Sequence, residues 1–455
     1  MPGNLSLDTL NKLVEAGDID TCIPCQIDMQ GRLMGKRLHA DFFLNTAVDE
    51  GHSCNYLLAT DLEMSTIDGY ASSGWSEGYG DFVVKPDLDT LRLVPWLDKT
   101  AMVICDVFDH HGHGEVPHSP RTMLKRQIER LGEHGWTAMA ATELECHLFG
   151  KSYEELHAEG YRELTPLSPY NQDYHVFQTT KEEHVMQAIR NGLHGAGVPI
   201  EGTKGEADVG QEEINVRYSD ALDTADNHAI TKNAAKEIAW QKGRALTFLA
   251  KWSHEVAGNS SHLHQSLWNR DGEPVFHDPD GHYGMSQTMR HYLAGLLRYS
   301  GEMAFFIAPY VNSYKRFAKG TFAPTNVVWS GDNRTAGYRV CGEGTKSVRI
   351  ECRFGGSDLN PHLALAAQIA AGLAGIEEKL ELEPEFSGDA YQAEDVERFP
   401  PNLRVAMENL RGSKMLRSAF GDAVVDHYCR AAEWEIEEQD RVVSDWEVAR
   451  GFERA

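Results

Sequence analysis

Charged and histidine side chains alternate with apolar ones in four segments that otherwise have the composition of buried strands. Successive side chains of a strand point to opposite faces, so every second residue lies on the same face. In ATELECHLF, the residues that share a face are Glu143, Glu145 and His147. In SSHLHQSLW, they are His262, His264 and Ser266. Because burying isolated charges is costly, these side chains should pair with one another or bind metal ions.

The other two segments add further carboxylates together with arginines. In GEADVGQEEINVRY, Glu206 and Glu213 flank a Gly-Gln turn, and in KSVRIECRF one face carries Arg349, Glu351 and Arg353. A single strand of this kind is explained by one face of an antiparallel sheet that is open to water. Four such strands, with acids, histidines and arginines mixed, favour a binding site instead.

These residue types point to chemistry on phosphate groups. Several carboxylates with a single imidazole suit Mg²⁺ or Mn²⁺ better than zinc, and arginines supply planar forks for phosphate and carboxylate. The chain has no G-x-x-x-x-G-K-[ST] phosphate loop, and the Gly-rich run from Gly342 to Lys346 has the wrong spacing for one. A nucleotide would therefore be held by metal ions and arginines on a sheet.

Hydrophobic periodicity predicts helices and strands around these residues. The predicted helices cover residues 6–17, 121–132, 181–194, 226–250, 285–304, 361–380 and 401–442. The predicted strands cover residues 19–29, 35–39, 87–95, 101–108, 137–149, 211–218, 261–268, 326–329, 336–341 and 347–354. This mixture indicates an α+β fold, and 455 residues favour two domains, because single cores stop growing at roughly 250–300 residues. The Gly- and His-rich stretch 110–118 marks the expected boundary, and a linker explains its histidines at least as well as a metal site does.

The overall charge and the cysteines narrow the class of protein. The chain carries 43 Lys and Arg against 69 Asp and Glu, a net charge of −26, which argues against nucleic acid or an anionic membrane surface as a partner. The N-terminus lacks the pattern of a signal peptide, and no apolar run reaches the roughly 18 residues of a membrane helix. A cytoplasmic enzyme is therefore predicted. The eight scattered cysteines, Cys22 and Cys25 among them, are expected to be buried thiols.

Six blocks together resemble glutamine synthetases of the bacterial type, over nearly the whole chain. The blocks are ATELECHLF, GEADVGQEEINVRY, GNSSHLHQSL, NSYKRFAKGTFAP, NRTAGYR and KSVRIECRFGGSDLNPHLALAAQIAAGL. The resemblance implies an N-terminal β-grasp domain, residues 1–113, and a catalytic domain, residues 114–455, with a curved antiparallel sheet and helices. It also implies a homo-oligomer, a dodecamer of two hexameric rings, with each active site shared between neighbouring subunits.

The resemblance assigns roles to individual residues. One metal ion, near glutamate and the amine, is expected at Glu145, Glu206 and Glu213, and a second, at the ATP phosphates, at Glu143, His262 and Glu351. Glutamate is expected at Gly258, Arg316 and Arg353. The nucleotide is expected at His264, Ser266, Arg334, Arg339, Lys346 and Arg349. The expected catalytic residues are Arg334, Arg349 and Asp68, the last of them in a loop that acts on the adjacent subunit.

The reaction that the resemblance implies has two steps and uses ATP as co-substrate with two or more Mg²⁺ or Mn²⁺ ions. The γ-carboxylate of glutamate attacks the γ-phosphate of ATP and forms γ-glutamyl phosphate and ADP. A neutral amine then displaces phosphate from this intermediate. Since free amines are mostly protonated near neutral pH, the site must also accept a proton.

Two departures from the family pattern concern the amine. Where ammonia-using members carry a glutamate just before Ala-Pro, this chain has Phe322, which cannot hold ammonium as an anion or accept its proton. In the loop after Asp68, the Asp-Gly-Ser-Ser pattern becomes Asp-Gly-Tyr-Ala, with the bulkier Tyr70 and with Ala71 in place of a serine. These changes favour an organic amine, as in γ-glutamylpolyamine and γ-glutamylethanolamide synthetases. The alternatives are an ordinary glutamine synthetase, a non-catalytic relative that serves as scaffold or sensor, and a guanidino-type phosphotransferase.

Overall fold

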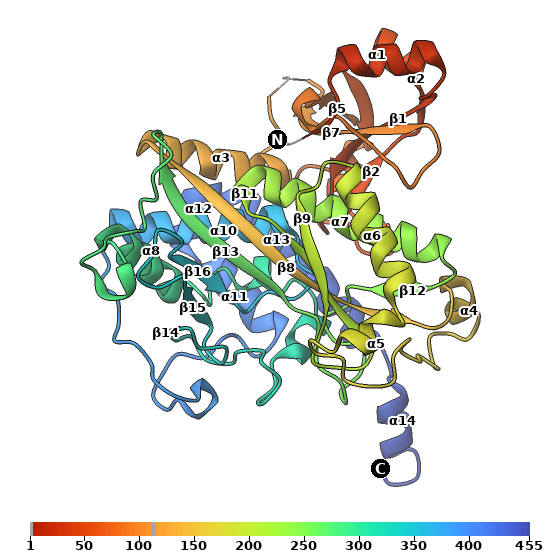
Figure 1. Cartoon of the computed structure of the whole chain (residues 1–455). Coiled ribbons are helices and arrows are strands. Elements are labelled where there is room, and N and C mark those ends of the chain that lie inside the picture. Colours follow the sequence, from red (N-terminus) through yellow and green to blue (C-terminus); the bar gives the residue numbers. More distant parts are fainter. Residues whose placement is uncertain (1–2, 112–113) are drawn as a thin grey trace.

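The computed structural model describes residues 3–111 and 114–455 and confirms the predicted α+β fold (Figure 1). Residue 113, at the predicted domain boundary, lies outside the described residues. The first sheet has the strand order β2-β1-β7-β5-β4, and β1 runs parallel to β7. Its strands, with the edge strands β3 and β6, are β1 (Thr21–Ile27), β2 (Leu33–Gly35), β3 (Leu38–His39), β4 (Gly51–Cys54), β5 (Asp81–Pro86), β6 (Arg92–Leu93) and β7 (Thr100–Asp109). The helices α1 (Leu7–Ala16) and α2 (Ala40–Phe42) accompany this sheet.

The second sheet carries the polar segments and has the order β14-β15-β16-β13-β8-β10-β9. Its neighbours pair antiparallel, except that β14 runs parallel to β15. The strands are β8 (Trp136–Phe149), β9 (Ile200–Gly205), β10 (Gln211–Val216), β11 (Ser219–Asp220), β12 (Ala245–Thr247), β13 (Ser261–Asn269), β14 (Trp329–Gly331), β15 (Tyr338–Cys341) and β16 (Arg349–Cys352). The short strands β11 and β12 both pair with β8, so β8 is the strand around which this sheet is built.

Helices cover one side of the second sheet and form the main core with it (Figure 1). The central helix α10 (Pro361–Glu377) is buried along nearly its whole length, because most of its residues are apolar or small on all sides. The other helices are α3 (Pro120–Glu133), α4 (Tyr153–Ala158), α5 (Val176–Thr180), α6 (Glu183–Gly195), α7 (Ala221–Gln241), α8 (Gln287–Arg298), α9 (Ala304–Ile307), α11 (Leu403–Gly412), α12 (Lys414–Phe420), α13 (Asp422–Arg441) and α14 (Asp445–Gly451). Within the described part of the chain, no helix combines the length and apolarity that a bilayer crossing needs.

The structure differs from the predicted elements where a local signal interrupts a periodic pattern. The predicted helix 401–442 is three helices, because Ser413 caps the N-terminus of α12 and Gly421 takes a φ of 92° before α13. The predicted helix 226–250 begins earlier and stops at Gln241, and β12 follows it. The predicted strand 87–95 is largely a 3₁₀ turn, Leu88–Thr90, followed by the two-residue strand β6.

Buried polar contacts join the segments around the first sheet to the helices that pack on the second sheet. Arg121, at the start of α3, donates to Asp87 (2.7 Å) beside the first sheet and to Asp226 (3.0 Å) on α7. The side-chain amide of Asn360, which caps α10, donates to the carbonyls of Asp28 (3.0 Å) and Met29 (3.1 Å). Since Arg121 and Asp226 are both almost fully buried, removing either partner would leave a charge unpaired in the core.

A stack of buried rings lies where α13 meets the loop of Asp68. The rings of His118 and His427 are stacked with centroids 4.2 Å apart, and Tyr70 lies 4.3 Å from His427 on its other side. Nε2 of His427 lies 3.4 Å from Sδ of Met29. Burial lowers the pKa of His118 to about 4 and holds the pKa of His427 well below its usual range. Both imidazoles are therefore neutral in the fold at neutral pH.

This stack predicts acid-sensitive stability. An unfolded histidine takes up a proton below a pKa of about 6.5, whereas the folded His427 does not, so the free energy of unfolding falls as pH decreases. Between pH 7 and pH 5 one such histidine costs about 2 kcal/mol. Urea denaturation at the two pH values measures the free energy of unfolding. Between pH 7 and pH 5 this free energy should fall by about 2 kcal/mol less in His427→Phe than in the wild type. His184→Phe, on an exposed position of α6, is the control. Equal pH dependence in wild type and His427→Phe would contradict the prediction.

Candidate active site

A cavity of about 1600 Å³ opens over the face of the second sheet that lies away from α10. Its floor comes from β8, β10 and β13, and its walls come from β9, the loop 249–258 and the loop 312–322. Carboxylates and basic side chains make up about half of its lining, and small, amide and aliphatic residues make up most of the remainder, with the aromatic rings of Tyr174, Trp252 and Phe322. The polar faces predicted from strand alternation therefore meet in one place.

The strand register explains why the predicted metal ligands converge. Side chains of residues directly paired across neighbouring strands lie on the same face, about 5 Å apart. Glu145 of β8 is paired with Glu213 of β10, and Glu143 of β8 is paired with His262 of β13. In the same way His264 is paired with Glu351 of β16. The three pairs are staggered by two residues from one to the next, so the polar residues form a diagonal band on one face across four strands.

The first predicted group consists of three carboxylates without a histidine. Oxygens of Glu145, Glu206 and Glu213 all lie within 4.8 Å of one another. Burial, with Glu206 and Glu213 beside it, raises the pKa of Glu145 well above its usual range. Burial, with Glu143 and Glu206, raises the pKa of Glu213 to about 8. Such mutual repulsion is relieved when a divalent cation binds between the oxygens.

Neighbouring backbone and amide groups fix the orientation of Glu145. Its Oε2 accepts hydrogen bonds from the backbone N–H of Ser260 (2.6 Å) and from Nε2 of Gln211 (3.2 Å). The same Gln211 amide also donates to the carbonyl of Gly258 (3.0 Å). One carboxylate oxygen is thus held by the protein, and the other is left for a ligand.

The second predicted group consists of Glu143, His262 and Glu351, whose ligand atoms also lie within 4.8 Å of one another. Nδ1 of His262 lies 2.8 Å from Oε2 of Glu143 and 3.4 Å from Oε1 of Glu351. Burial opposes the charge of Glu351, but Arg353 together with His264 and His262 lowers its pKa to about 2. Glu351 is therefore an anion at neutral pH.

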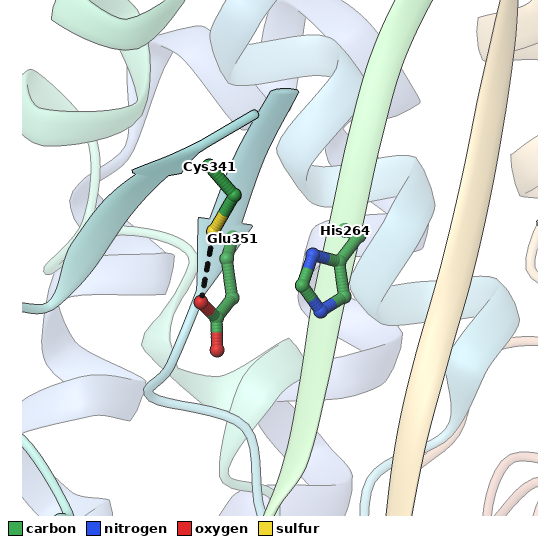
Figure 2. A group of neighbouring side chains, drawn as sticks. All are labelled: His264, Cys341 and Glu351. Atoms are coloured by element: carbon green, nitrogen blue, oxygen red, sulfur yellow. Dashed lines mark hydrogen bonds between the residues drawn. The ribbon is translucent and has the colours of Figure 1, made fainter. Parts of the chain in front are cut away.

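A cysteine that the sequence analysis did not single out lies beside Glu351 of this second group. Cys341 on β15 and Glu351 on β16 lie on neighbouring strands, with His264 opposite them on β13 (Figure 2). The thiol of Cys341 donates to Oε2 of Glu351 (3.4 Å), and burial raises its pKa to about 12. Alternation along β15 puts Arg339 and Cys341 on one face, and this signal was available in the sequence.

Arginines surround the second group of ligands. Arg339 donates to Glu351 (2.9 Å) and Arg353 also donates to it, while Nε of Arg349 donates to Nδ1 of His264 (3.2 Å). The described residues provide no acceptor for Nε of Arg353, a buried donor that a carboxylate ligand could use. Arg334 lines the cavity.

The remaining predicted nucleotide residues lie at the outer part of the same sheet. Ser266 accepts a hydrogen bond from the indole of Trp268 (3.0 Å), and Lys346 is exposed in the turn between β15 and β16. The structure thus places Ser266 and Lys346 beside the arginine-rich end rather than in the cavity wall.

The predicted glutamate-binding residues fall into two layers. Gly258 and Arg353 line the cavity, whereas Arg316 is buried behind its wall and donates to the hydroxyl of Ser260 (3.1 Å) and the carbonyl of Arg353 (3.2 Å). A Cβ atom at position 258 would lie 2.4 Å from Cγ of Arg316. Glycine is therefore needed there for the arginine to pass beneath the wall, whether or not a ligand also approaches.

Phe322 and Asp68 lie in loops. Phe322 lines the cavity in a turn with a φ of 55°, a left-handed conformation that is rare for an aromatic residue, and 55% of its surface is exposed. Asp68 is exposed and is not among the described residues that line this cavity. Its carbonyl accepts a hydrogen bond from Arg430 of α13 (2.8 Å).

Comparison with known proteins identifies the family to which this chain belongs. A family model described as the catalytic domain of glutamine synthetase matches residues 117–451. The chain belongs to the glutamine synthetase family. It is 48% identical to the gamma-glutamylethanolamide synthetase GlnA4 of Streptomyces coelicolor, over 99% of this chain and 96% of that protein. It is 36% identical to a glutamate–isopropylamine ligase of a Pseudomonas species, over 96% of each.

A solved structure of GmaS without ligand is similar in three dimensions. The TM-score is 0.85 at 26% identity, and the match covers 98% of this chain and 99% of that one. As a member of the glutamine synthetase family, this chain is a ligase that forms carbon–nitrogen bonds, and enzymes of the family use ATP and divalent metal ions. Two groups made mostly of carboxylates, one of them with an imidazole, have the ligand chemistry for such ions.

A further set of cavity residues in this glutamine synthetase family member was not predicted, apart from Glu206, which was predicted as a metal ligand. Asp173, Tyr174, Lys204 and Glu206 form what we call the Lys204 corner, at the end of the cavity that lies beside Glu213. The sequence analysis missed it because β9 was not predicted and the segment 171–175 has no periodic pattern. The alternation of Lys204 with Glu206 along GTKGEAD was the available signal.

Proposed function

We propose that this enzyme joins the γ-carboxyl of glutamate to the nitrogen of an organic amine, such as ethanolamine or a polyamine, through γ-glutamyl phosphate. The observation that carries the proposal is Phe322, an exposed aromatic ring at the cavity wall where ammonia-using enzymes that the chain resembles have a glutamate. A ring can cover the alkyl part of a larger amine or lie against its cation. Two relatives are named as a gamma-glutamylethanolamide synthetase and a glutamate–isopropylamine ligase, and these names support an organic amine as substrate.

Two Mg²⁺ or Mn²⁺ ions are proposed at the two groups of ligands. Glu145, Glu206 and Glu213 would hold the ion beside glutamate, and Glu143, His262 and Glu351 would hold the ion beside the ATP phosphates. When bound, such ions neutralise charge on phosphate and carboxylate oxygens.

In the first step, Arg339 and Arg353 are proposed to orient the reactants and to stabilise negative charge on the transferred phosphoryl group. A γ-carboxylate oxygen of glutamate forms a bond to the γ-phosphorus of ATP, and the bond to ADP breaks. In the second step, the amine nitrogen bonds to the γ-carbonyl carbon, phosphate leaves with its electron pair, and the nitrogen loses a proton to a carboxylate. Arg334 and Arg349 are proposed to stabilise the same phosphate.

Asp68 is the proposed acceptor of that proton, from a neighbouring subunit. Its exposed position outside the cavity of its own chain supports a role across an interface. This role requires an oligomer, and we propose the dodecamer of two hexameric rings for an enzyme that works in the cytoplasm. On this proposal a dissociated subunit retains its ligand groups but is inactive.

The proposal predicts which amines support catalysis. Phosphate release from ATP and glutamate with Mg²⁺ or Mn²⁺ would be measured with ammonia, methylamine, ethanolamine, isopropylamine, putrescine, spermidine and aniline. At least one organic amine should give a kcat/KM roughly tenfold or more above that of ammonia, since an apolar contact with a ligand is worth about 1–3 kcal/mol. Preference for ammonia would make the enzyme an ordinary glutamine synthetase, and silence with every amine would contradict the proposal.

A further inference from the structure

The corner of the cavity beside the proposed amine site contains an ammonium group of the protein itself. Lys204 of β9 is directly paired with Glu213 of β10, so the two side chains lie on the same face of the sheet. The ammonium of Lys204 makes an ion pair with Glu206, lies 3.3 Å from Oδ1 of Asp173, and lies 4.3 Å from the centroid of the Tyr174 ring. Two carboxylates and an aromatic face thus surround one cation.

Backbone contacts hold this arrangement in place. The N–H of Tyr174 donates to the carbonyl of Gly205 (3.3 Å), directly after Lys204. The side-chain amide of Asn171 donates to the carbonyl of Ala207 (3.0 Å), and its oxygen accepts from the N–H of Asp173 (3.0 Å). The segment 171–174 is therefore anchored at two points that directly follow the lysine, at the end of β9 and in the turn after it.

The composition of the Lys204 corner is that of a cation-binding site. Carboxylates pair with ammonium groups, and the face of a tyrosine ring attracts a cation within about 6 Å. The side chain of Lys204 is only 20% exposed, so its charge is only partly screened by water. A second ammonium group brought into the corner would meet a like charge and find the three attractive groups already in use.

We propose that Lys204 occupies the position that the second ammonium of a diamine or polyamine would need, and that the enzyme therefore selects amines with a single amino group. This inference rests on the proposed function and narrows it, because it concerns the tail of the amine that enters beside Glu213. Of the two examples named there, ethanolamine fits and a polyamine does not. The selected substrates have an uncharged tail, apolar or hydroxylated, and Lys204 is the residue that determines this selection.

Butylamine and putrescine provide the sharpest test, because they share a four-carbon chain and differ only in the second amino group. The ratio of kcat/KM for butylamine to that for putrescine should exceed about ten in the wild type, a difference of about 1.4 kcal/mol. Lys204→Met should lower the ratio at least tenfold, since it removes the like charge and frees Asp173 and the Tyr174 ring for the substrate's ammonium. Lys204→Arg keeps the charge and should keep the ratio.

Lys181→Met is the matched control. Lys181 also lies over aromatic rings, 5.6 Å from the centroid of Tyr170 and 5.1 Å from that of Phe177, but it does not line the cavity. Its replacement should leave the ratio unchanged. Calorimetric titration of putrescine into the protein with glutamate and ADP gives a readout besides turnover, and putrescine should bind more tightly to Lys204→Met than to the wild type.

The outcomes separate this inference from the proposed function. Wild-type turnover of putrescine as good as that of butylamine would overturn the role of Lys204 and leave the proposed function intact. A uniform loss with Lys204→Met, at an unchanged ratio, would show that the lysine only supports the structure and would also overturn the inference. Turnover of ammonia alone would contradict the proposed function itself.

Discussion

Replacement of Glu213 by glutamine is expected to lower kcat/KM with the preferred amine by roughly a thousandfold. The glutamine side chain has the shape of the protonated acid, which Glu213 is inclined to be, because its pKa is raised to about 8. The fold should therefore be retained. The variant cannot supply an anionic oxygen, however, and a catalytic metal ion contributes several kcal/mol, with about 1.36 kcal/mol corresponding to each factor of ten.

The neighbouring glutamate provides the control for this experiment. Glu212 points to the opposite face of β10, is buried, and accepts a hydrogen bond from Gln172 (3.2 Å). Burial and Glu182 raise its pKa to about 9, so Glu212→Gln changes little at neutral pH. Steady-state kinetics and Mn²⁺ titration should show loss in Glu213→Gln only, with Mn²⁺ affinity reduced at least about tenfold. Wild-type Mn²⁺ affinity in Glu213→Gln would remove Glu213 from the proposed metal site.

Replacement of Phe322 by glutamate is expected to raise the ratio of kcat/KM for ammonia to that for the preferred organic amine by at least about tenfold. The new carboxylate would attract ammonium, and a pair of opposite charges at about 4 Å is worth roughly 1–4 kcal/mol near a protein surface. At the same time, the substituted enzyme loses the ring that contacts the alkyl part. The positive φ of 55° at position 322 is unfavourable for phenylalanine and for glutamate alike, because neither is glycine, so the backbone strain should not change with the substitution.

Tyr161 offers a close match for the control substitution. It has a φ of 57° and 54% of its surface exposed, nearly the same values as Phe322, but it does not line the cavity. Tyr161→Glu should leave amine preference unchanged in competition assays that measure both products. If Phe322→Glu behaves like Tyr161→Glu, the ring does not contact the amine, and another wall of the cavity must determine the choice.

Strand alternation predicted the metal-ligand face because it depends only on the period of two. Once Glu143 and Glu145 share a face of β8, antiparallel pairing places Glu213 of β10 beside Glu145 and His262 of β13 beside Glu143 on that same face. The sequence could not show the depth at which each arginine lies, since that depends on loop packing. Arg316 and Arg353 looked equivalent, yet only Arg353 faces the cavity.

Residues that gather through irregular backbone were beyond prediction for a related reason. Asp173 and Tyr174 reach Lys204 through hydrogen bonds between a loop and a strand end, and such contacts leave no period in the sequence. The prediction of a single helix over residues 401–442 was wrong. The apolar spacing continues through this whole segment, and the interruptions at Ser413 and Gly421 are too short to break that pattern in the sequence. The overall α+β fold and the polar strand faces came from features with a clear period, whereas the division of the ligands into two groups, with Glu206 among them, came from the family resemblance.

The contacts of Arg121 and Asn360 determine whether the region matched by the family model could fold without the N-terminal part of the chain. The family model covers residues 117–451, but a fragment with that boundary would lose Asp87, the partner of Arg121, and the two carbonyls that the Asn360 amide satisfies. Asn360 caps the central helix α10, so the loss would reach the middle of the core. We therefore expect that the region matched by the family model does not fold stably on its own. Limited proteolysis that cuts between Asp87 and Arg121 should yield fragments that stay associated and melt in a single cooperative transition.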